Sequence, residues 1–160
     1  MKHGVIYMVL AAAVILTGSL PFSNHDVGKL QPVETLSVAV EEGTVVLETD
    51  AGDRGAGSTW GAAMENLKAT APGSVFLGTV SFLLLDDSAL ELLPVILTRQ
   101  EINPACSLCL GRRGMDLEAA GAYLRAHEPE KNLRLMRAEG GALPRLLEED
   151  GRYLLVQPGN

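Results

Sequence analysis

The apolar run "VFLGTVSFLLL" (residues 75–85) constrains the fold more than any other stretch of the chain. It is rich in residues that favour strands, and apolar and polar side chains do not alternate strictly along it. Strands of this kind are typical of sheets that are covered on both faces. The run therefore predicts an α/β (α+β-like) domain, with a strand here at the centre of a sheet and helices on both sides of it.

The segments before this run predict a hairpin and a helix. Residues 33–40 and 44–49 favour strands and are joined by a short turn that contains glycine, which is typical of a β-hairpin. Residues 59–70 carry their large apolar side chains at helical spacing, and Ser58 is a candidate N-cap for that helix.

The segments after the run predict a helix, a strand and a second helix. An Asp-Asp-Ser sequence at residues 86–88 opens an apolar segment, in which Pro94 predicts a kink or a late helix start. Residues 105–111 favour a strand. Asp116 is a candidate cap for a helix that runs to about His127.

The last 30 residues predict a short βαβ tail. Residues 132–138 are expected to form an edge strand, residues 142–149 a helix with Pro144 in its first turn, and residues 152–156 a last strand. The whole order is then ββαβαβα followed by this tail. Strands that alternate with helices imply right-handed crossovers, so we expect a mixed β-sheet covered by helices.

The N-terminal segment has the pattern of an export signal. Lys2 precedes an uncharged apolar run at residues 5–17, which ends in small residues. A bilayer span needs about 17–25 residues, and this run reaches that length only if residues 18–22 are added. We therefore expect an export signal or a weak membrane anchor at residues 1–22, a linker at 23–32 and a single α/β domain at 33–157. Cleavage and retention of the signal stay open.

The charge distribution limits the kinds of partner that the protein is expected to bind. The formal net charge of -7 argues against nucleic-acid binding. Residues 26–103 carry 12 acidic and 4 basic side chains, whereas residues 104–160 are balanced. Anionic lipid headgroups would repel the acidic part, so any membrane attachment is expected through the N-terminal segment. From the export pattern of the N-terminal segment we expect the protein on the outer face of the cytoplasmic membrane, or secreted if the signal is cleaved.

A glycine-rich segment, "GDRGAGST", lies between a predicted strand and a predicted helix, where phosphate-binding loops occur. Such a loop needs a lysine directly after its last glycine, and Ser58 stands there instead. Nearby carboxylates would also repel a phosphate. We predict a plain connecting loop from Gly52 to Gly57, and keep a small-ligand or calcium site as an alternative; its residues would be Asp50, Asp53, Gly55, Gly57 and Ser58.

Cys106 and Cys109 form the only C-x-x-C pair, which in an exported protein is a candidate redox dithiol. Residues three apart on a strand face opposite sides of the sheet, which makes a disulfide between them awkward. One pair is also too few ligands for structural zinc. The favoured interpretation is two small side chains packed against helices. No catalytic residue, metal or cofactor is predicted.

From about residue 16 to residue 127 the chain resembles the N-terminal domain of the Ger(x)C proteins, the C subunits of spore germinant receptors. The resemblance is carried by "LTG", "DVGKLQPVETLSVAVEEG", "GSTWGAAMENLKATAP", "VFLGTVSFLLLDDSALELLPVIL" and "EINPACSLCLGRRGMDLEAA". It implies an exported, membrane-associated partner protein of a spore-forming bacterium, without catalytic residues. Ser19 stands where that family has its lipid-bearing cysteine, so lipidation is not implied.

Together these observations predict a non-catalytic binding or assembly module that meets a protein partner at the membrane, related through the resemblance to spore germination. Two alternatives stay open. One is a thiol-disulfide oxidoreductase that uses Cys106 and Cys109. The other is a small-ligand or metal binder at the Gly52–Gly57 segment.

Overall fold

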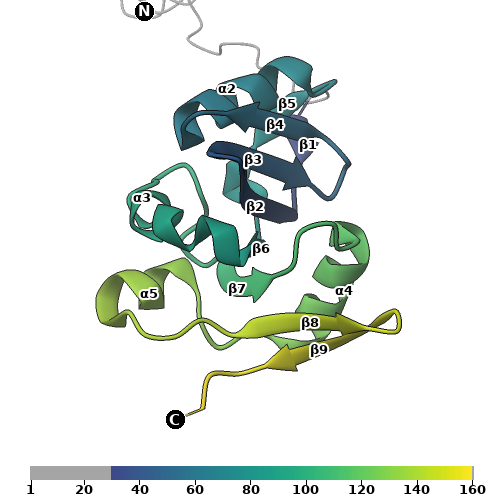
Figure 1. Cartoon of the computed structure of the whole chain (residues 1–160), viewed down its shortest axis with the longest axis vertical. Coiled ribbons are helices and arrows are strands. Elements are labelled where there is room, and N and C mark those ends of the chain that lie inside the picture. Colours follow the sequence, from purple (N-terminus) through teal and green to yellow (C-terminus); the bar gives the residue numbers. More distant parts are fainter. Residues whose placement is uncertain (1–29, 160) are drawn as a thin grey trace, which may run out of the picture.

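The computed structural model describes residues 30–159. They form a seven-stranded mixed sheet with helices, together with a small two-stranded sheet (Figure 1). The expected α/β (α+β-like) fold is thereby confirmed. The expected export signal or anchor, and most of the expected linker, lie outside the described residues.

The large sheet is parallel in its centre and antiparallel at both sides. β2, β6, β7 and β8 are parallel neighbours, while β3 and β4 extend the sheet on one side and β9 on the other. In spatial order the strands are β4 (Arg54–Gly57), β3 (Thr44–Thr49), β2 (Thr35–Glu41), β6 (Phe82–Leu85), β7 (Ser107–Gly111), β8 (Arg145–Glu149) and β9 (Arg152–Val156).

Helices cover both faces of this sheet. The larger core lies on one face, beneath α2 (Trp60–Thr70), α3 (Leu93–Leu97) and α5 (Leu133–Glu139). The smaller core lies on the other face, beneath α4 (Leu117–His127). Strand β6 serves both cores, because all four of its side chains are buried and they alternate between the two faces.

The expected hairpin and first helix are confirmed. β2 and β3 pair in antiparallel fashion, from Leu36 opposite Thr49 to Glu41 opposite Thr44. The N-cap of α2 is Thr59 rather than Ser58, because the Thr59 hydroxyl accepts the Ala62 N–H at 3.2 Å.

The central apolar run forms two strands, not one. Its first part is β5 (Ser74–Phe76) and a 3₁₀ turn, η2 (Leu77–Thr79), and only its last part is the central strand β6. The Thr79 side chain holds this break, since its Oγ1 accepts the Val33 N–H at 3.2 Å. β5 pairs in parallel with β1 (Leu30–Pro32), which lies at the end of the expected linker.

The next two helices begin where the sequence predicts. Asp86 caps the 3₁₀ helix η3 (Asp87–Leu92), and α3 starts late, with Pro94 in its first turn. Asp116 caps α4 by accepting the Ala119 N–H at 3.0 Å. The strand expected at residues 105–111 is confirmed as β7.

The expected βαβ tail is wrong in its first two elements. In place of the strand expected at residues 132–138, the helix α5 runs from Leu133 to Glu139, because the Asn132 side chain accepts the Leu135 N–H and both Leu133 and Met136 turn into the core. The segment expected to be a helix with Pro144 in its first turn forms β8 instead. β8 is joined to β9 through a turn at Asp150 and Gly151, both with positive φ, as the type I′ hairpin turn requires.

Candidate functional site

The two cysteines lie on opposite faces of the sheet. Cys106 precedes β7 and packs in the larger core, whereas Cys109 lies within β7 and packs in the smaller core. Both are free thiols and are almost completely buried. The sheet separates the two side chains, so they do not form the facing pair that a dithiol centre needs.

Burial also makes both thiols unreactive. Loss of hydration raises the pKa of Cys106 to about 12, with a smaller contribution from Cys109, and burial raises the pKa of Cys109 to about 12 as well. A redox-active cysteine works as a thiolate at an accessible, electropositive place. This geometry gives no support to the thiol-disulfide oxidoreductase alternative and favours a packing role for both residues.

The carboxylates of the glycine-rich segment hold the backbone in place. Asp50 Oδ2 accepts the N–H groups of Glu34 and Thr35, at 3.0 and 3.2 Å, where β2 begins. Asp53 Oδ2 accepts an N–H from the Gln31 side chain at 2.6 Å, next to β1. These two residues thus tie the turn after β3 to the start of the described chain.

The segment itself is a strand beneath a helix, which corrects the expectation of a connecting loop. Gly55 and Gly57 lie on β4, and the backbone of α2 passes directly above them. A Cβ at Gly55 would lie 2.4 Å from the Ala63 carbonyl oxygen, and one at Gly57 would lie 2.5 Å from the Ala63 nitrogen. Glycine is therefore required here by close packing, as is common where a helix touches a strand.

The residues of the expected ligand site do not converge. Ser58 is exposed in the link between β4 and α2, the two glycines face α2, and Asp50 borders a different surface. That surface is an open hollow of about 360 Å³, crossed by the ion pair between Arg125 and Glu34. Asp50 Oδ1 is buried there without a hydrogen-bond partner. Among residues 30–159 no cluster of acidic, histidine or cysteine side chains is arranged to hold a metal ion.

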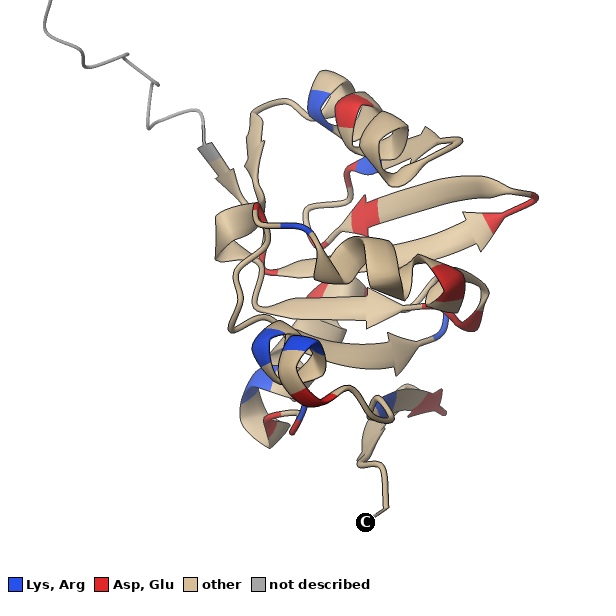
Figure 2. Cartoon of the chain, turned by 90° about the vertical axis from the view of Figure 1, so that its left-hand side faces the viewer, with Lys and Arg blue, Asp and Glu red and all other residues tan. Residues whose placement is uncertain are grey.

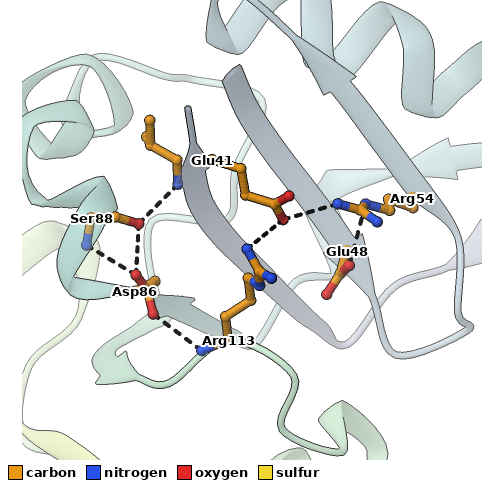
Figure 3. A network of polar contacts seen from close by, with 7 residues as sticks. Glu41, Glu48, Arg54, Asp86, Ser88 and Arg113 are labelled. Atoms are coloured by element: carbon orange, nitrogen blue, oxygen red, sulfur yellow. Dashed lines mark hydrogen bonds and ion pairs between the residues drawn. The ribbon is translucent and has the colours of Figure 1, made fainter. Parts of the chain in front are cut away.

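A polar network gathers instead at the carboxyl ends of the parallel strands, the edge where open α/β sheets bind ligands (Figure 3). Asp86 follows β6 and is its first node. Its Oδ1 accepts the Ser88 hydroxyl and N–H, and its Oδ2 accepts the Arg113 N–H at 3.1 Å. Ser88 Oγ in turn accepts the Val40 N–H at 3.0 Å. Asp86 thereby connects the ends of β2, β6 and β7.

Glu41 is the second node, at the end of β2. Its Oε1 is 3.0 Å from Arg113 Nη1 and 2.9 Å from Arg54 Nη2, and Arg54 Nε is 3.4 Å from Glu48 Oε1 (Figure 3). These side chains lie over the face of β2, β3 and β4 where Val46 is buried, the face opposite α2. Carboxylate and guanidinium groups thus alternate over the apolar face on which Val46 is buried.

A third ion pair links η3 to β8. Both guanidinium Nη atoms of Arg145 donate to the Asp87 carboxylate, at 2.8 and 2.9 Å. The hydrogen bonds from Arg145 lower the pKa of Asp87, and burial opposes that shift only in part. With the pair formed, the charges along this edge largely neutralise one another, which suits a structural link better than the capture of a charged ligand.

Uncovered apolar side chains lie at the opposite end of the molecule from β1. Leu154 and Val156 of β9 are 54% and 44% exposed, and Leu147 of β8 stands beside Leu154 on the same face of the hairpin. Figure 1 shows β8 and β9 as the lowest part of the fold, with β1, β5 and α2 near its top. We name Leu147, Leu154 and Val156 the hairpin face.

The edge of β9 is partly closed by α4. The Tyr123 hydroxyl accepts the outward-pointing Leu155 N–H at 3.3 Å. The same ring stacks on His127, with centroids 3.9 Å apart, and tilts against Tyr153. A protected edge reduces unspecific strand pairing, so this contact blocks the edge of β9 at Leu155 and leaves the hairpin face uncovered.

Sequence reasoning missed both the network and the hairpin face. The Asp-Asp-Ser sequence by itself predicts only a helix start, and Arg113 and Glu41 belong to no motif that links them to it. The hairpin face did have a signal, because Asp-Gly between two apolar segments is a strong hairpin pattern.

The fold and these surfaces define a helix-covered α/β domain with a mixed sheet. Comparisons with protein-family models, with curated proteins and with solved structures find no match to this chain. Among the helices of residues 30–159, none is long and apolar enough to cross a bilayer.

Proposed function

We propose that this chain is an exported, membrane-associated, non-catalytic module that binds a protein partner through the hairpin face. The single observation that carries the binding function is the exposure of Leu154 and Val156 next to each other on an edge strand. Exposed apolar side chains that gather on one surface are typical of sites that meet another protein.

The membrane half of the proposal rests on the sequence. The charged start, apolar run and small residues of the N-terminal segment are the pattern of an export signal, and retention of that segment would hold the domain at the outer face of the membrane. The excess of acidic residues in the sequence from 26 to 103 supports attachment through this segment alone.

A link to spore germination is the narrower form of the proposal. It is supported by the resemblance of residues 16–127 to the N-terminal domain of Ger(x)C proteins. A strain that lacks the gene should then make spores that germinate more slowly, and spores that germinate at the normal rate would remove this narrower form.

The export half is tested by fusing alkaline phosphatase to the C-terminus of the full chain. The enzyme is active only outside the cytoplasm, so we expect activity in the membrane fraction, and none when residues 1–22 are deleted. If the full-length fusion and the fusion without residues 1–22 are both inactive, export is refuted.

The binding half is tested with a photocrosslinking amino acid at Leu154 in the native host. The matched control carries it at Glu65, an exposed residue of α2. We expect one discrete crosslinked species from Leu154 and none from Glu65. The absence of any species from Leu154, or equal crosslinking at both positions, would refute the hairpin face as the binding surface.

A further inference from the structure

The strands of the small β1–β5 sheet and the segments that continue them carry no charged side chain of their own, and the charged groups closest to them are Asp53, beside Gln31, and Glu34, beside Pro32. Residues 30–33 and 69–85 contain no Asp, Glu, Lys or Arg. Figure 2 shows both strands without charge colours, directly where the described chain begins. This is unusual in a chain whose front part is strongly acidic.

One large apolar side chain is exposed on this sheet. Phe76 is 51% exposed and lies on the outer face of β5, opposite Pro32 of β1 in the parallel register. Val75, the next residue back, turns into the core. The outer face of the two strands therefore presents Phe76, Pro32 and the exposed Ser74, which we name the uncharged base.

The length of the chain fixes how far the uncharged base can be from a membrane anchor. The apolar N-terminal run ends by Phe22, and β1 begins at Leu30. The seven residues between them span at most about 25 Å even when fully extended. That distance is less than the thickness of a bilayer, which is about 40–45 Å with its headgroups.

We infer that the uncharged base is the membrane-facing surface of the domain, with Phe76 in contact with the lipid headgroup region. This inference rests on the proposed membrane association. A surface close to lipid must give up water, which is costly for charges and favourable for an aromatic ring. The uncharged base meets both conditions at the one end of the fold that the anchor holds near the bilayer.

This orientation also explains the placement of the hairpin face. β8 and β9 lie at the far end of the fold from β1 and β5 (Figure 1). A domain that stands on its uncharged base therefore presents Leu154 and Val156 away from the membrane, where a partner can reach them.

The test uses the full chain, reconstituted into phosphatidylcholine vesicles, with an environment-sensitive nitrobenzoxadiazole label at one introduced cysteine. The variants are Ser74→Cys, on the uncharged base, and Leu154→Cys, on the hairpin face. The native thiols do not compete for label in the folded protein, because both are buried and their pKa values are about 12. Quenching by nitroxide-labelled lipid reports contact with the bilayer.

We expect lipid nitroxides to quench the label at Ser74→Cys and to leave the label at Leu154→Cys unchanged, and Phe76→Ser to reduce the quenching at residue 74. If the chain floats with the vesicles but the label at residue 74 is not quenched, or both labels are quenched equally, the inference is overturned while membrane association stands. If the chain does not float with vesicles at all, the proposed membrane association itself fails.

Discussion

The contact between β4 and α2 makes a sharp prediction about Gly55. A methyl group there would lie 2.4 Å from the Ala63 carbonyl oxygen and 2.5 Å from the Leu67 nitrogen, so Gly55→Ala must push the helix away from the strand. Both contacts are with backbone atoms, which cannot rotate aside. Overpacking of this kind costs about 1–3 kcal/mol, and the backbone contacts place Gly55→Ala near the upper value.

The measurement is thermal unfolding followed by circular dichroism. For a domain of this size, 1 kcal/mol corresponds to a shift of roughly 4 °C in Tm, so Gly55→Ala should lower Tm by about 10 °C. Gly61→Ala is the matched control, because Gly61 lies in the same helix and a Cβ there would have no neighbour closer than 3.9 Å. Its higher helix propensity should raise stability by about 0.5–1 kcal/mol.

Opposite shifts for the two substitutions identify steric contact as the reason for glycine in β4. A Gly55→Ala variant as stable as the Gly61→Ala variant would refute this reasoning. It would also reopen the alternative in which the glycines of this segment bind a ligand, since glycines kept for a ligand could be replaced without loss of stability.

Three further predictions follow from the titrating groups. Burial raises the pKa values of Cys106 and Cys109 from 9.0 to about 12, so the thiols of the unfolded chain ionise at a lower pH than those of the folded protein. The free energy of unfolding should therefore fall between about pH 9 and 12, by up to ~1.4 kcal/mol per pH unit for each thiol. Urea titrations at several pH values should show a smaller fall over this range in the double variant Cys106→Ala/Cys109→Ala. Burial raises the pKa of Asp86, but the hydrogen bonds from Ser88 and Arg113 outweigh it and lower the pKa below 3.8. Asp86 therefore stabilises the fold above that pH, and its contribution is lost as the pH falls further. Asp86→Asn should cost about 1 kcal/mol at pH 7 and progressively less as the carboxylate of Asp86 becomes protonated, and an equal loss at pH 7 and in strong acid would contradict the ionic role. Arg145→Gln should cost less than about 1 kcal/mol, since both partners of its ion pair with Asp87 are well exposed; a larger loss in urea unfolding would show that this pair is more than a surface link.

Most of the fold from β2 to α4 could be predicted, because its signals are local. The hairpin of β2 and β3 follows from strand-forming residues around a tight turn, and α4 follows from Asp116 and helical spacing. The break in the central run could not be predicted. It depends on Thr79, whose hydroxyl bonds the backbone of Val33, a residue far away in the sequence.

The tail shows how a single residue can outweigh propensity. Residues 132–138 favour a strand by composition, but Asn132 caps a helix, and a helix brings Leu133 and Met136 to the same face. By sequence Pro144 fits the first turn of a helix, yet its carbonyl oxygen accepts the Leu110 N–H at 2.7 Å and so extends the sheet. Sheet contacts between distant residues decide this segment.

The candidate sites were harder to predict than the fold, since their meaning depends on contacts across the sequence. The opposite orientation of Cys106 and Cys109 was predictable from the two-residue period of a strand, and the structure places them so. The role of Gly55 and Gly57 could not be predicted, because a glycine that allows a helix to pack closely on a strand looks the same in the sequence as a glycine in a phosphate-binding loop.

Three acidic residues of the front part have structural roles. Asp50 accepts backbone N–H groups at the start of β2, and Asp86 accepts the Ser88 hydroxyl and the Arg113 N–H. Glu41 forms ion pairs with two arginines. These carboxylates thus bind donor groups of the protein itself. A cation at Asp86 or Glu41 would have to displace those donors and would break a link between strands. Strands β1 and β5 contain no acidic or basic residue, and that asymmetry, rather than the total charge, supports the inferred contact of this end of the domain with a lipid surface.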